Sequence, residues 1–118
     1  MLTGILGQIS QLFIYLHKVL FMSEFVINTL REYLSSQPVL KAWLFGSYSR
    51  GKETVDSDID LLVSFDSAAR ISLMKLSGMS LELEELLGRE VDIIPEGSLR
   101  PYAEASVNRD KILIYERI

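Results

Sequence analysis

Two aspartates that open an apolar run are the residues best placed to do chemistry. Asp58 and Asp60 flank Ile59, and the run continues from Leu61 to Phe65. Side chains alternate between the faces of a strand, so a strand here places both carboxylates on one face, about 7 Å apart. Such carboxylates repel each other unless they are protonated or bridged by cations. Mg²⁺ binds carboxylate oxygens and usually brings phosphates as further ligands, so the pair predicts a magnesium and phosphate site.

A glycine and a serine end the preceding apolar run. The segment from Val39 to Phe45 is typical of a strand, and Gly46-Ser47 then begins a polar loop. Glycine lets the backbone approach a ligand closely, and the N–H groups of such a turn can form a concave site for phosphate oxygens. The two strands and the loop together predict one nucleotide-binding site. The alternative is an Asp-rich hairpin turn with a solvated acidic strand end.

A third carboxylate interrupts a β-branched run further along the chain. Asp92 lies inside the predicted strand 91–94. A buried strand does not normally tolerate an unpaired charge, so Asp92 needs either a cation or a solvent-facing edge.

These residues form a recognisable motif. Gly46-Ser47-x-x-Arg50-Gly51, followed by Asp58-x-Asp60, resembles the signature of the DNA-polymerase-beta-like nucleotidyltransferase superfamily in its smallest form. The chain looks most like the minimal nucleotidyltransferases (MNT) that are encoded beside HEPN-domain proteins in prokaryotic toxin–antitoxin pairs. The resemblance covers roughly residues 23 to 118. It implies a nucleotidyltransferase fold and transfer of a nucleoside monophosphate from a triphosphate to a hydroxyl group, with release of pyrophosphate.

The resemblance also implies a role for each residue of the motif. Two Mg²⁺ ions would be held by carboxylates that are at once catalytic and metal-ligating: Asp58, Asp60 and Asp92. The phosphates would be held by a nucleotide-binding set: Gly46, Ser47 and Arg50. Asp92 would ligate the metal nearest the acceptor and take the proton of its hydroxyl. An alternative for Arg50 is an ion pair with Asp56 or Asp58 that shapes the turn.

The resemblance extends to a partner protein. The MNT antitoxins neutralise a HEPN ribonuclease toxin by adenylylating it, commonly at tyrosine, which implies ATP as substrate, a HEPN toxin as partner and a cytoplasmic location. Two other interpretations stay open. One is an antitoxin that acts by binding alone, and the other is a transferase for a small molecule such as an aminoglycoside.

Size and composition limit the function classes. A chain of 118 residues is one domain, too short to add a separate substrate domain, so a partner or a homo-oligomer must help to hold the acceptor. Its 12 basic and 16 acidic residues give a net charge of −4, which argues against direct nucleic-acid binding. The absence of cysteine excludes disulfides, thiolate metal sites and a cysteine nucleophile.

The first 22 residues form a separate amphipathic segment. Their apolar residues recur at spacings of three and four, as in a helix, and are Ile5, Leu6, Ile9, Leu12, Phe13, Leu16, Val19 and Leu20. The segment fits neither a signal peptide nor a membrane span. We expect an appendage (1–22) before a minimal nucleotidyltransferase domain (23–118), and Met22 is an alternative start. A partner-binding, self-associating or membrane-surface helix are the other readings.

Turn and cap signals divide the domain into alternating elements. We expect a helix over 23–36 with Ser23 as its N-cap, strands over 39–45 and 59–65, a helix over 69–87 capped by Asp66-Ser67 and ended by Gly88, a strand over 91–94, a helix over 98–108 and a strand over 111–115. The core stripe of the second helix is predicted as Leu73, Leu76, Met79, Leu83, Leu86 and Leu87, with Met74 also packed. This order predicts an α/β (α+β) fold, a mixed sheet of about four strands flanked by helices.

Overall fold

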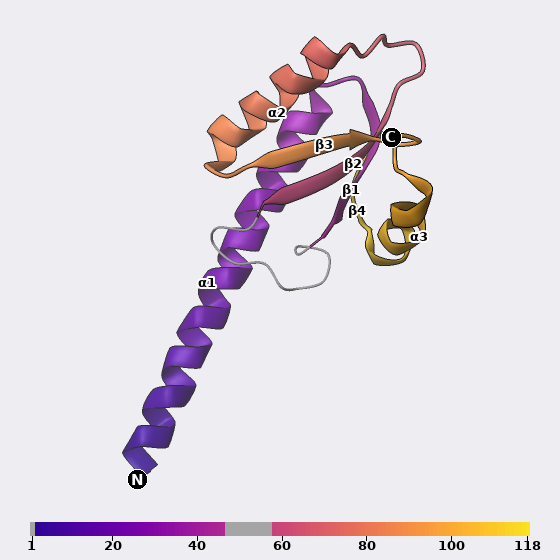
Figure 1. The fold of residues 1–118 in the computed structure, drawn as a ribbon. Helices are drawn as coiled ribbons and strands as arrows, with labels where there is room; N and C mark the ends of the chain where they lie inside the picture. Colours follow the sequence, from indigo (N-terminus) through magenta and orange to yellow (C-terminus); the bar gives the residue numbers. More distant parts are fainter. Residues whose placement is uncertain (1, 47–57) are drawn as a thin grey trace.

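The chain begins with a helix and two strands, after which helices and strands alternate (Figure 1). The computed structural model describes residues 2–46 and 58–118, and before residue 24 it describes side chains only at positions 7, 9, 10, 12 and 13. The elements within these ranges are α1 (Leu2–Ser35), β1 (Val39–Phe45), β2 (Ile59–Phe65), α2 (Leu73–Leu87), β3 (Val91–Pro95), α3 (Pro101–Asp110) and β4 (Ile112–Glu116).

The strands form one mixed sheet in the order β3-β2-β1-β4. β1 is antiparallel to both β2 and β4, whereas β2 and β3 are parallel. A parallel pair needs a long crossover connection, and α2 supplies it between β2 and β3. The predicted mixed sheet of four strands is confirmed, and the bounds predicted for the first two strands are those observed.

Helices α1 and α2 cover one face of the sheet. The buried side chains of this layer come from α1 (Val26, Leu30, Leu34), from α2 (Met79, Leu83) and from alternate positions of the strands, including Ile59, Leu61, Val63, Val91 and Ile93. α3 lies away from these two helices (Figure 1). The intervening positions of β2 and β3, which carry Asp60 and Asp92, therefore face away from α1 and α2.

Helix α2 begins later than predicted and ends where predicted. The hydroxyl of Ser72 accepts the backbone N–H of Lys75 at 3.1 Å, which makes Ser72 the N-cap. The predicted cap at Asp66-Ser67 is wrong, because the Asp66 carboxylate instead accepts the N–H of Ala68 at 3.0 Å in a turn. Gly88 closes the helix in the left-handed conformation, as expected.

The predicted core stripe of α2 is too wide. Met79 and Leu83 are buried, and Leu76 and Leu87 pack against the core. Leu73 is 83% exposed and Leu86 is 54% exposed, so the prediction is wrong for both. These two residues lie at opposite edges of the stripe, where the helix surface curves away from the sheet. The prediction that Met74 packs is also wrong, because its side chain is 85% exposed.

The chain from residue 2 to residue 35 is one helix, not two. The predicted N-cap at Ser23 is wrong, because α1 continues through that position. No glycine or proline lies between Gly7 and Pro38, so nothing in the local sequence breaks the helix. None of the described helices combines the length and the hydropathy of a membrane span. The domain boundary between residues 22 and 23 stays a prediction.

The last helix and strand are shifted from their predicted bounds. α3 begins at Pro101, where a missing N–H costs nothing, instead of at Ser98. β4 then runs to Glu116 and pairs with β1, and Lys111 lies over the Trp43 ring at 4.6 Å from its centroid.

The burial of α2 generates a stability prediction. Leu83→Ala removes a fully buried side chain and should lower the free energy of unfolding by about 2–5 kcal/mol. Leu81→Ala, on the exposed side of the same helix, is the matched control and should change it by less than about 0.5 kcal/mol. Urea denaturation followed by circular dichroism measures both, and equal losses would contradict the packing described here.

Candidate active site

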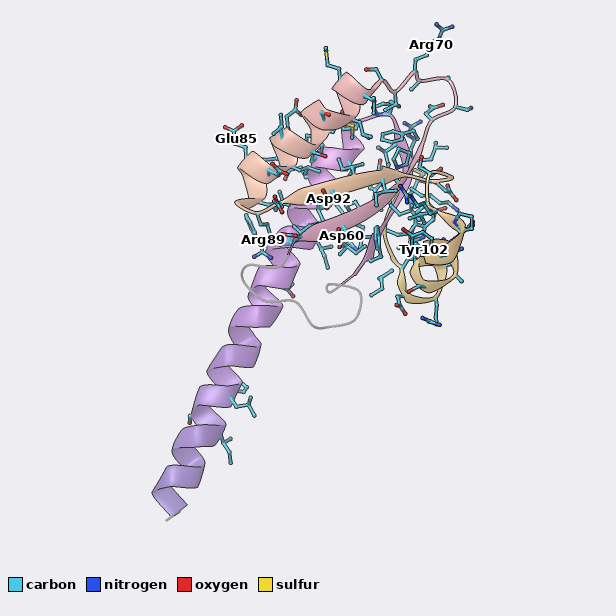
Figure 2. The ribbon with its side chains drawn as sticks, in the orientation of Figure 1. Asp60, Arg70, Glu85, Arg89, Asp92 and Tyr102 are labelled. Atoms are coloured by element: carbon cyan, nitrogen blue, oxygen red, sulfur yellow. The ribbon has the colours of Figure 1, made fainter. Side chains whose placement is uncertain are left out.

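Two of the three predicted carboxylates lie side by side on neighbouring strands. The parallel register of β2 and β3 pairs Asp60 with Asp92 (Figure 2). Partners in a parallel pair point to the same face, and adjacent strands are about 4.8 Å apart. Their neighbours Ile59 and Val91 belong to the core, so both carboxylates face away from α1 and α2. The structure thus brings together residues separated by more than thirty positions in the sequence.

The third carboxylate belongs to the same neighbourhood. Asp58 immediately precedes β2 and is exposed, whereas Asp60 is half-buried. The pKa of the Asp60 carboxyl is raised above its ordinary value, first by burial and then by the negative charges of Asp92 and Asp58. The predicted repulsion between the carboxylates therefore acts on Asp60, in addition to its burial.

Gly46 packs directly against Asp60. Its φ of +74° lies in the left-handed region, and a Cβ at this position would come within 2.5 Å of the Asp60 Oδ2 atom. The antiparallel register of β1 and β2 explains this approach, because Phe45 is the partner of Asp60. The positive φ favours glycine here, and a larger residue would also displace the Asp60 carboxylate, so the Gly46 turn and Asp60 are close neighbours.

Two predicted site residues lie outside the described residues. They are Ser47 and Arg50 of the predicted nucleotide-binding set, so the loop's phosphate contacts remain a prediction.

The carboxylates alone do not close a metal site in this structure. Within residues 2–46 and 58–118, no three His, Cys, Asp or Glu side chains are arranged to hold one ion. The donors nevertheless suit Mg²⁺, a hard cation that prefers carboxylate oxygen and leaves ligand positions to phosphate and water. Burial and the charges of Asp92 and Asp58 raise the pKa of Asp60, and a cation would offset both effects on the carboxylate.

A small hollow beside the Gly46 turn was not predicted. Its volume is about 140 Å³, and it is lined by Phe45, Gly46, Ser106, Val107 and Asp110. Sequence reasoning missed the contribution of α3, because no spacing signal connects residue 46 with residue 106. A larger hollow of about 420 Å³ lies at the other end of β2 and β3, around the turn after Phe65, away from the carboxylates.

The geometry agrees with comparisons to known proteins. A family model described as "Nucleotidyltransferase domain" matches residues 27–114. The chain belongs to this family. The family assignment suggested by the Gly46-Ser47 and Asp58-x-Asp60 motif is thereby confirmed, and the protein is a nucleotidyltransferase.

This nucleotidyltransferase is similar to a named adenylyltransferase and to proteins of solved structure. The protein adenylyltransferase MntA of Thermococcus cleftensis is 38% identical over 71 residues, which are 60% of this chain and 70% of that protein. A toxin–antitoxin crystal structure with AMP-PNP shares the fold, with a TM-score of 0.67, 22% identity, and coverage of 77% of this chain and 73% of that chain. A tri-AMPylated Shewanella oneidensis HEPN toxin in complex with MNT antitoxin gives a TM-score of 0.63, 20% identity, and coverage of 80% and 73%.

The contact between Gly46 and Asp60 generates the second prediction. Gly46→Ala should cost more stability than Gly97→Ala, because both positions have positive φ but only Gly46 has a side chain in the way. The conformational strain alone is about 1–2 kcal/mol, and the clash with the Asp60 carboxylate adds to it. Chemical denaturation measures the difference, and equal costs for the two variants would rule out the close approach.

The repulsion at Asp60 predicts a pH dependence without divalent cations. A folded-state pKa above the unfolded value means that stability is lost as pH rises through the folded pKa. Asp60→Asn removes this loss, so in EDTA the variant should be more stable than the wild type at pH 7, with the difference shrinking below about pH 4.

Asp66 provides a control of opposite sign. Its pKa is lowered by the hydrogen bond from the Ala68 N–H and by Arg117, so its contribution to stability is present at neutral pH and lost as pH falls. Asp66→Asn should therefore be less stable than the wild type at pH 7. Thermal unfolding across pH 3–8 tests both signs, and a destabilised Asp60→Asn at pH 7 in EDTA would contradict the assignment.

Proposed function

We propose that this nucleotidyltransferase moves AMP from ATP to a hydroxyl group of a partner protein, in a Mg²⁺-dependent reaction, and that the partner is a HEPN ribonuclease toxin. The observation that carries the proposal is the register that pairs Asp60 with Asp92, with Asp58 beside them and Gly46 against Asp60. This arrangement gathers negative charge on one face of the sheet, next to a turn that begins with glycine.

The comparisons support the acceptor class. The Thermococcus cleftensis relative is named a protein adenylyltransferase, and its matched region covers most of its own length. One of the similar toxin–antitoxin structures contains an ATP analogue, AMP-PNP, and the other contains a tri-AMPylated HEPN toxin. We extend these properties to the present chain as hypotheses, with cytoplasm as the compartment where ATP and such a toxin would meet.

The reaction is an in-line displacement at the α-phosphorus. The acceptor oxygen forms a bond to this phosphorus, the bond to the bridging oxygen of the β-phosphate breaks, and pyrophosphate leaves. The acceptor proton passes to a carboxylate, for which Asp92 is the proposed base because it is exposed and adjacent to Asp60. Asp58, Asp60 and Asp92 would hold two Mg²⁺ ions, which when bound supply charge neutralisation on the phosphates and on the leaving group.

The turn after β1 is the proposed phosphate site. Gly46 brings the backbone against Asp60, and this proximity would set the terminal phosphates beside the metal-binding carboxylates. The Ser47 backbone N–H and hydroxyl would bind the same phosphates, and the Arg50 guanidinium would neutralise their charge by a bidentate contact.

A partner is needed to complete the acceptor site. Within residues 2–46 and 58–118 the strands form a single sheet, and its carboxylate face is not covered by α1 or α2. Proteins that modify another macromolecule can use the substrate itself to close such a face. A HEPN toxin that presents a tyrosine hydroxyl there would be both the acceptor and the second wall of the site.

Label transfer from ATP tests this proposal. The full chain, co-purified with the protein it binds, is incubated with Mg²⁺ and ATP labelled at the α-phosphate. We expect label on the partner, and a loss of at least about 100-fold in Asp58→Asn, because a metal-binding carboxylate acts on the transition state. Mass spectrometry of the partner then identifies the modified hydroxyl.

A matched aspartate distinguishes chemistry from folding. Asp66→Asn changes the same atoms at the opposite end of β2 and should transfer label at nearly the wild-type rate. Label that persists in Asp58→Asn would exclude the proposed metal site. A partner that is bound and inhibited but never labelled would instead identify an antitoxin that acts by binding alone.

A further inference from the structure

The first part of α1 projects beyond the rest of the molecule. The helix is 34 residues long, and Val26 is the first buried residue among its described side chains. Figure 1 shows the N-terminal part extending away from the sheet and from the other helices. At 1.5 Å per residue, residues 2–25 form a rod about 36 Å long. This rod precedes the segment that matches the nucleotidyltransferase family, which begins at residue 27.

The rod exposes the continuation of a buried stripe. Ile9 and Leu12 are each 58% exposed, three positions apart on one side of the helix. In a seven-residue repeat, Ile9 shares its position with Leu30, and Leu12 shares its position with Val26. Leu30 and Val26 are buried against the chain's own sheet. The face of α1 that packs at one end is therefore the face that meets solvent at the other.

Charge distinguishes the possible occupants of this stripe. Residues 1–23 contain no acidic residue, and their basic side chains are His17 and Lys18. A helix that lies on a membrane surface normally has many Lys and Arg on its polar face, which this segment lacks. A second copy of the chain brings an identical apolar stripe with no charge to desolvate, and a two-fold axis makes such a surface complementary to itself.

The length of the rod is sufficient for helix pairing. Residues 2–25 span about three heptads, the shortest length over which a sustained heptad pattern indicates a coiled coil. In proteins most helical stability comes from packing an apolar face, so an unpartnered apolar stripe leaves this helix without that contribution. We propose that the N-terminal half of α1 pairs with the same segment of a second copy through the stripe that contains Ile9 and Leu12.

The pairing would leave the carboxylate site open. The rod extends away from the sheet, whereas Asp60 and Asp92 lie within β2 and β3 on the face opposite α1 (Figure 2). The sheet domains of the two copies would both lie outside the paired helices. Each would keep its own Gly46 turn. The proposal does not depend on the acceptor or on the metal, so its test is independent of the transfer assay.

Sedimentation equilibrium of the full chain tests the proposal. We expect a mass of twice 13.4 kDa for the wild type. The double variant Ile9→Glu and Leu12→Glu should raise the dimer dissociation constant by at least about 100-fold, because each dimer exchanges four buried apolar side chains for carboxylates. The control, Ser10→Glu and Gln11→Glu, adds the same charge at positions that face the other side of the helix and should remain a dimer.

The measurement also has clear opposing outcomes. A retained cooperative thermal transition in both double variants would show that the sheet domain is still folded, since both changes lie outside its core. A wild type that stays monomeric up to about 100 µM would overturn the proposal. So would equal dissociation of both double variants, binding of the monomer to anionic vesicles through Ile9 and Leu12, or a one-to-one complex with a different protein through the same residues.

Discussion

The repulsion among three carboxylates is the constraint on which the proposed site depends. Burial and the charges of Asp92 and Asp58 raise the pKa of Asp60, so the fold keeps negative charge where it is unfavourable. Such an arrangement costs stability unless a cation or a proton compensates for it. Binding of a cation and a nucleotide would relieve this repulsion. The unfavourable charge of the empty site would therefore favour substrate binding.

The sheet is what keeps these charges together. The core face of β2 and β3 is held by Ile59, Leu61 and Val91 under α1 and α2, so the strands cannot slip by one residue without burying the carboxylates. Gly46 then closes the remaining space beside Asp60. Stability on one face of the sheet and chemistry on the other are thus two consequences of the same strand alternation.

The described side chains in the first half of α1 lie outside the core. Among the described side chains of α1, burial begins at Val26, whereas Ile9 and Leu12 are exposed. Contacts between copies and contacts with an acceptor would use different surfaces, the rod in one case and the Asp60 and Asp92 carboxylates in the other.

The sequence by itself determined the strand pair, the motif and the family. β1 and β2 have the predicted bounds because their apolar runs are short and are bounded by turn residues. In β2 the apolar residues also alternate with Asp60. All of these are local properties of the sequence. The Gly46 turn and the Asp58-x-Asp60 spacing are equally local. The core stripe of α2 was only partly predictable. Leu73 and Leu86 have the same side chain as Leu83, but they are exposed whereas Leu83 is buried, and this difference depends on which part of the helix the sheet covers.

Only the tertiary structure determined which residues from distant parts of the sequence become neighbours. The pairing of Asp60 with Asp92 depends on the parallel crossover through α2, and the hollow next to Gly46 depends on where α3 returns to the sheet. The continuity of α1 through Ser23 also needed the structure, since a serine is compatible with both a cap and a helix interior. Local sequence fixes periodicity and turns, whereas contacts between distant segments depend on the packing of the whole core.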